Sequence, residues 1–100
     1  MSRLTERELG IPEGIVDEDG VDNTEIVRIW WQGNAPKMVI RPALREPRMV
    51  GAMLAELAFH FSRAFEDRAG YRQQDAMKQI MDGWTDAHAY AAEQKKDDGQ

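Results

Sequence analysis

The chain contains no cysteine, and that absence removes several kinds of chemistry at once. Disulfide bonds, iron–sulfur clusters and thiol catalysis all need a cysteine sulfur, so none of them is open to this protein. Long apolar runs are missing too, because no stretch approaches the roughly 18 residues that a membrane-spanning helix needs. The first ten residues are charged and lack the apolar region of a signal peptide. These absences predict a cytoplasmic protein with no membrane partner.

An excess of positive charge is also lacking. The net charge is −5, and all of it belongs to residues 1–23, which hold two basic and seven acidic side chains. The rest of the chain holds 11 of each sign. Binding to a nucleic-acid backbone needs a basic stripe, so we expect no nucleic-acid partner. Glycine and proline interrupt residues 1–23, which we expect to be an acidic flexible arm, either solvated or docked on the body through its few aliphatic residues.

Residues 24–42 predict an antiparallel β-hairpin. Alternating β-branched and aromatic residues indicate a first strand that ends at Gln32, and residues 37–41 indicate a second strand. If residues 33–36 form the turn, Gln32 lies opposite Lys37 and Arg28 lies opposite Arg41. One face of this hairpin is wholly apolar and would seat a helix; its members are Ile29, Trp31, Met38 and Ile40.

A long amphipathic helix is predicted over residues 46–69. Pro47 suits its first turn, and Gly70 can take the left-handed conformation that ends a helix. Apolar side chains recur at spacings of three and four, the period of one helix face. They are Val50, Met53, Leu54, Leu57, Phe61, Ala64 and Phe65.

A second helix is predicted over residues 73–92, followed by a polar tail. Its apolar stripe consists of Met77, Ile80, Met81, Trp84 and His88. The fold class is therefore α+β: an antiparallel hairpin followed by two helices packed on one sheet face. A third strand from the arm or from a second subunit would complete the small sheet. We expect an acidic arm at 1–23, a single domain at 24–93 and a disordered tail at 94–100.

The sequence resembles that of a family of small uncharacterised bacterial proteins, which is classed as a domain of unknown function. The resemblance covers about residues 24–90. It rests on the Arg-Ile-Trp of the first strand and on a spaced pattern in the long helix. The residues that carry it are Arg28, Ile29, Trp30, Glu46, Pro47, Gly51, Leu54, Leu57, His60 and Phe65. The resemblance implies a domain of a hairpin and helices, and it supplies no activity.

Nothing in the sequence forms a recognisable reaction centre. Ser62 and His60 are two residues apart and so lie on different faces of the helix, which does not make a nucleophile–base pair. Glu56 and His60 are spaced as a helical chelating pair, but an ordinary polar face explains them as well. We therefore predict no catalytic residue, no metal site and no cofactor, and we do not expect an enzyme.

One candidate binding surface is the outer face of the hairpin. Residues 25–48 hold five basic and two acidic groups. Like charges opposite each other on a sheet are unfavourable unless an anion lies between them. The arginines either reach into water or bind a carboxylate of a second subunit, the acidic arm at residues 17–19, or an anionic ligand. The predicted anion- or partner-binding residues are Arg28, Trp30, Arg41, Arg45 and Arg48.

The other candidate surface is a second stripe of the long helix, centred on Ala52, Ala55 and Phe59. Its members are Arg48, Ala52, Ala55, Phe59, Ser62 and Glu66. Either the second helix covers it or it forms a dimer interface, because small residues permit close approach and an aromatic residue can anchor a contact. A body of about 70 residues is marginal by itself. We expect a non-enzymatic, self-associating interaction module that forms a homodimer. The alternative is a binder of a small anion or acidic peptide at the arginine-rich face.

Overall fold

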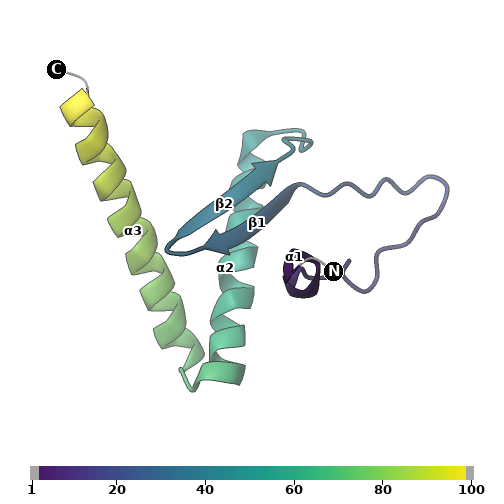
Figure 1. Cartoon of the computed structure of the whole chain (residues 1–100), viewed down its shortest axis with the longest axis horizontal. Coiled ribbons are helices and arrows are strands. Elements are labelled where there is room, and N and C mark those ends of the chain that lie inside the picture. The colour runs from purple at the N-terminus through teal and green to yellow at the C-terminus, as the bar shows by residue number, and fades with distance from the viewer. Residues whose placement is uncertain (1–2, 99–100) are drawn as a thin grey trace. The chain divides into compact units, whose positions relative to one another are not determined.

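The computed structural model describes residues 3–98, which form an α+β fold. Figure 1 shows its elements in chain order. They are α1 (Arg3–Arg7), β1 (Val27–Gln32), β2 (Ala35–Ile40), α2 (Pro47–Ala69) and α3 (Gln73–Asp98). The chain divides after Ala43 into two compact units, one with the arm and hairpin and one with α2 and α3. The predicted class, a hairpin followed by two helices, is confirmed, whereas the packing of the helices on the sheet stays a prediction.

The hairpin pairs in a different register from the one that the sequence predicts. Gln32 lies opposite Ala35, and Arg28 lies opposite Val39 rather than Arg41. The predicted turn at 33–36 was therefore two residues too long. Gly33 takes a φ of 64° and Asn34 no positive φ, as in a type II′ turn, which needs only these two residues.

Pro36 is tolerated inside β2 because of its place in the ladder. In a two-residue hairpin the pair that flanks the turn is hydrogen bonded and the next pair is not. Trp31 and Pro36 form that next pair, so the proline nitrogen faces away from β1 and breaks no bond. The register differs by two residues, and side chains alternate between faces with a period of two. The four apolar residues predicted to share a face therefore still share it.

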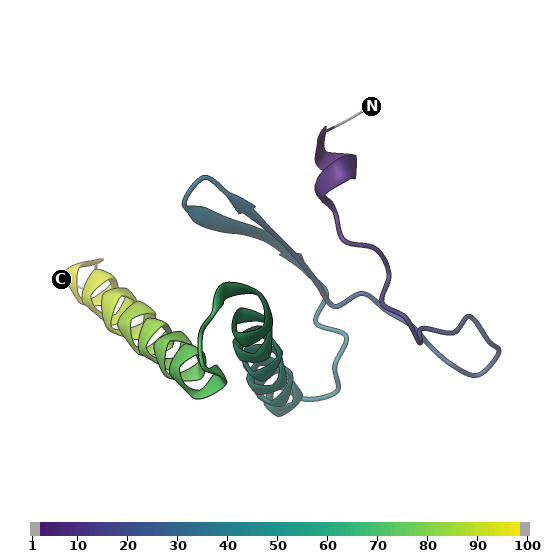
Figure 2. The ribbon, with the colours of Figure 1, turned by 90° about the horizontal axis from the view of Figure 1, so that it is seen from below.

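The helix α2 begins one residue after the predicted start and ends at the predicted residue, Ala69. Pro47 occupies the first turn, and Gly70 ends the helix with a φ of 77°, in the left-handed region. The two helices meet at a tight turn at residues 70–72 and diverge from it (Figures 1 and 2). Close contact is confined to the region near that turn, because the bulkier apolar residues farther along both helices remain exposed.

Small and polar side chains build this α2–α3 turn. The Ser62 side chain is fully buried, and its hydroxyl donates to the Phe59 carbonyl at 2.6 Å. The same hydroxyl accepts a bond of 2.8 Å from the side-chain amide of Gln73. The Glu66 carboxylate accepts a bond of 2.8 Å from the Gln73 backbone N–H, which caps the start of α3. Beside them, the rings of Phe65 and Tyr71 meet edge to face, with centroids 5.5 Å apart.

The helix α3 continues to Asp98, six residues beyond the predicted end at 92. The expected disordered tail at 94–100 is helical through Asp98, and residues 99–100 lie outside the described residues. The physical reason is composition: Glu93, Gln94, Lys95 and Lys96 are good helix formers, and lysine near a C-terminus complements the helix dipole.

Replacing Ser62 with leucine should destabilise the helical unit by about 1–3 kcal/mol. The larger side chain has no room between the helices, and the Gln73 amide loses its acceptor. Urea unfolding followed by circular dichroism measures the change. Glu56→Leu is the matched control, because Glu56 is exposed on the same helix and should shift stability by less than about 0.5 kcal/mol. Equal effects of the two substitutions would contradict the close packing at Ser62.

Candidate functional site

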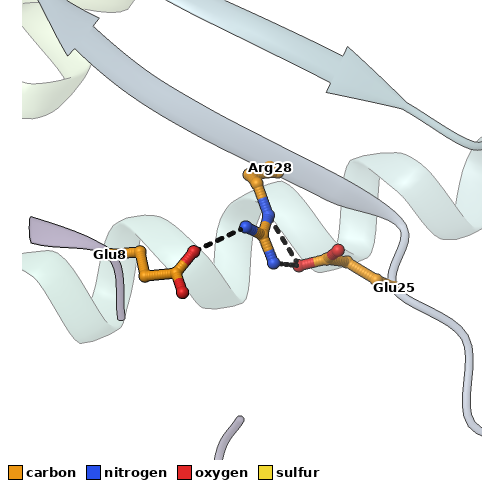
Figure 3. A network of polar contacts seen from close by, with 3 residues as sticks. All are labelled: Glu8, Glu25 and Arg28. Carbon is orange, nitrogen blue, oxygen red and sulfur yellow. Dashed lines mark hydrogen bonds and ion pairs between the residues drawn. The ribbon is translucent and has the colours of Figure 1, made fainter. Parts of the chain in front are cut away.

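A three-residue ionic network links the arm to the hairpin (Figure 3). One terminal nitrogen of Arg28, Nη1, lies 3.1 Å from Oε2 of Glu8. The other, Nη2, lies 3.2 Å from Oε2 of Glu25, and Nε donates to the same oxygen at 3.3 Å. One guanidinium is therefore held between two carboxylates, one local and one from 20 residues earlier in the chain.

Local geometry explains the Glu25 half of this network. Glu25 lies three residues before Arg28, at the entry to β1, and receives two of the guanidinium's hydrogen bonds. The hydrogen bond and charge of Glu25, followed by the charge of Glu8, raise the pKa of Arg28 above its usual value. The side chains of Arg28 and Glu8 are each 44% exposed, so water and salt screen their pair.

The arm covers part of the outer face of the hairpin, which we call the Arg28 face: Arg28, Trp30, Gln32, Ala35, Lys37 and Val39. A cleft of about 630 Å³ lies between α1 and this face, lined by Leu4 and Arg7 on one side and Trp30 and Val39 on the other. Trp30 is half-buried, whereas Trp31 is 70% exposed. The arm therefore approaches the sheet as a helix, and within the described residues the sheet keeps two strands.

The acidic residue that contacts Arg28 is Glu8, not the cluster at residues 17–19 that the sequence suggested. That cluster belongs to a separate turn, in which the Val21 N–H donates to the Glu18 carbonyl at 3.2 Å. Gly20 has a φ of 86°, as the third position of a type II turn requires. Sequence reasoning missed Glu8 because it is one of seven acidic residues in the arm and nothing local marks it.

The structure separates the predicted anion-binding residues into two groups. Arg28, Trp30 and Arg41 belong to the hairpin unit, and Arg45 and Arg48 are exposed residues of the helical unit. Arg41 lies just past β2, where its backbone N–H donates to the Ile26 carbonyl at 2.7 Å. It is not opposite Arg28, yet both arginines line a shallow pocket of about 340 Å³ at the open end of the hairpin.

The predicted dimer stripe on α2 is partly covered and partly open. Its C-terminal residues, Ser62 and Glu66, contact α3 through Gln73. Ala52, Ala55 and Phe59 remain exposed, with Phe59 45% exposed. The guanidinium carbon of Arg63 lies 5.9 Å from the centre of the Phe59 ring, which is a cation–π contact.

The described residues hold no group of three or more histidine, aspartate and glutamate side chains placed to bind a metal ion. His60 lies beside Phe59, with ring centroids 6.4 Å apart. His88 stacks on Trp84 at 4.6 Å, and its Nδ1 lies 3.0 Å from the Trp84 carbonyl. Within the same part of the chain, no helix is long and apolar enough to cross a membrane.

Comparison with known proteins identifies the family of this chain. Residues 8–97 match the model of a domain of unknown function, DUF5076, so the chain belongs to that family. A similar fold occurs in the solved structure of a “putative pyruvate dehydrogenase from the photosynthetic bacterium Rhodopseudomonas palustrus CGA009”. That likeness has a TM-score of 0.68 and 18% sequence identity, and it covers 81% of each chain. No curated protein matches. At this identity the likeness shows the fold alone.

Stoichiometric Zn²⁺ or Ni²⁺ should leave the melting temperature of the full chain unchanged. A ligand raises stability only if it binds the native state preferentially, and the described helices present one histidine–carboxylate pair at chelating spacing, Glu56 and His60. Differential scanning fluorimetry over a metal titration measures this. A large, saturating rise that His60→Ala abolishes would contradict the expectation and would establish a metal site on α2.

Proposed function

We propose that this protein is a non-enzymatic interaction module that associates with itself through α2. The observation that carries the proposal is the scarcity of buried residues. Among residues 3–96, whose side-chain exposure the structure describes, only Ser62 and Ala76 are buried. Apolar faces left in water are costly, and association is a common way for a small domain to cover them.

The open part of the α2 stripe has the properties of a helix–helix contact. Ala52 and Ala55 are small enough to let another helix approach closely, and Phe59 offers an aromatic anchor one turn beyond. A two-fold axis near this stripe would place the same residues of two copies against each other, as in most homodimers. The cation–π contact with Arg63 orients the Phe59 ring before association.

Among the residues that the structure describes, no feature supports an enzymatic alternative to the same degree. The structural neighbour's name refers to a dehydrogenase, but 18% identity carries no activity to this chain. Ser62 is buried and hydrogen bonded at the α2–α3 turn, so it does not act as an exposed nucleophile. We also propose that the module works in the cytoplasm, in keeping with the complete absence of cysteine.

Analytical ultracentrifugation at micromolar concentration should give about twice the monomer mass of 11.4 kDa. Phe59→Asp should shift the protein to monomer, because it places a charge at the centre of the interface. His60→Asp is the matched control, since it adds the same side chain one residue away on another face of α2. Circular dichroism checks that both variants keep their helices. A wild-type monomer at 100 µM, or equal dissociation of the two variants, would contradict the proposal.

The alternative function, binding of a small anion, has one observation in its favour. Arg41 lines the pocket that it shares with Arg28, and it makes no ion pair with a described residue. Arg28 itself is already held by two carboxylates, which weakens the pocket as an anion site. For this reason we place anion binding second.

If the pocket binds anions, inorganic pyrophosphate at millimolar concentration should shift the NMR signals of residues 25–28 and 39–41 in a saturable way. Arg41→Ala should weaken that binding about tenfold, because a charge-assisted hydrogen bond to the anion is lost. Arg45→Ala, an equal loss of charge in the helical unit, should have little effect. If the two variants gave identical titrations, the signal changes would reflect general charge attraction, and the proposed anion site would be rejected.

A further inference from the structure

We propose that the Arg28 face is a binding site for a short peptide segment that carries an aliphatic residue and, four positions later, a carboxylate, and that the N-terminal arm occupies it as a tethered ligand. The same site would then accept the arm of a second copy in exchange. This inference concerns the hairpin unit alone and does not depend on association through α2.

The polar half of the recognition is the guanidinium of Arg28. Glu25 supports it from within the hairpin, through hydrogen bonds to Nε and Nη2. Nη1 points away from Glu25 and donates to Oε2 of the arm residue Glu8 at 3.1 Å (Figure 3). Glu25 thus orients the guanidinium, and the arm supplies the second carboxylate. An arginine held in this way offers Nη1 as a directed, charged donor to the carboxylate of a ligand.

The apolar part of the site is the cleft in which Leu4 faces the hairpin. Leu4 lies within α1, and Glu8 directly follows Arg7, the last residue of that helix. Leu4 lines the 630 Å³ cleft together with Trp30, Met38 and Val39. A second cleft of about 670 Å³ extends along β1 and is lined by residues 7–10 of the arm and by Trp30. The ligand is therefore defined by an aliphatic residue and a carboxylate four positions later in the sequence.

The arm is attached in a way that permits release. Residues 10–24 contain no helix or strand, so the tether can lengthen without breaking regular structure. Its one side-chain contact of note, from the Asn23 amide to the Val16 carbonyl, closes a local loop within the tether. A flexible tether of this kind holds its ligand at an effective concentration in the millimolar range. An untethered peptide must compete with that concentration, so the arm sets a threshold for binding.

The test uses the full chain and a fluorescent peptide of residues 1–12 as the probe. The wild type should bind the probe weakly, because its own arm fills the site. Glu8→Lys replaces attraction to Arg28 by repulsion in the tethered arm and should tighten probe binding about fivefold by raising the open fraction. Glu6→Lys is the matched control, with the same net charge on the same arm, since Glu6 makes no ion pair with a described residue. Fluorescence anisotropy measures the affinities.

Charge reversal separates recognition from a general loss of structure. The full chain with Arg28→Glu should reject the unmodified probe and bind a probe that carries Glu8→Arg. In NMR spectra, probe binding should move the indole signal of Trp30 and leave that of Trp84 in place. Equal binding by the Glu6→Lys and Glu8→Lys chains, or no rescue by the reversed probe, would overturn the proposal. Absence of binding to every chain at millimolar probe would overturn it as well.

Discussion

The shortage of buried apolar volume is the constraint on which the rest of this structure depends. Folding of a small domain has to offset about 1–2 kcal/mol of backbone entropy for each ordered residue, and burial of apolar surface is the main source of that free energy. Here the helical unit buries two small side chains, Ser62 and Ala76, while larger ones such as Phe61 and Trp84 remain 54% and 51% exposed. The units hold their local structure through helix periodicity, turns and capping, and they leave large apolar side chains exposed.

Polar groups do the positioning where apolar contact is scarce. At the α2–α3 turn, Glu66 and Ser62 fix the first residue of α3 through its backbone and its side chain. In the hairpin unit, Arg28 joins the arm to the sheet. The segregation of charge in the sequence acquires a physical meaning here, because the acidic arm carries its charge to a basic residue of the body. Charges scattered evenly along the chain would not favour one binding position for the N-terminal arm.

The sequence predicted the elements well and their connections poorly. Periodicity, Pro47 and Gly70 set the bounds of α2 because each acts within a few residues. The predicted hairpin register is wrong because proline is typical of a turn, whereas Pro36 fits a non-hydrogen-bonded position inside β2. The partner of Arg28 was not predictable, since a contact between residues 8 and 28 depends on the fold of the arm and has no local signature.

The central claim is that this chain completes its apolar burial by association, and the concentration dependence of its thermal stability tests that claim most directly. When only the associated state is fully covered, mass action raises the unfolding midpoint as protein concentration rises. We predict a steady increase in the melting temperature of the wild-type chain between about 1 and 100 µM. A cooperative transition with the same midpoint at every concentration would show that the monomer is stable by itself, and would contradict the claim.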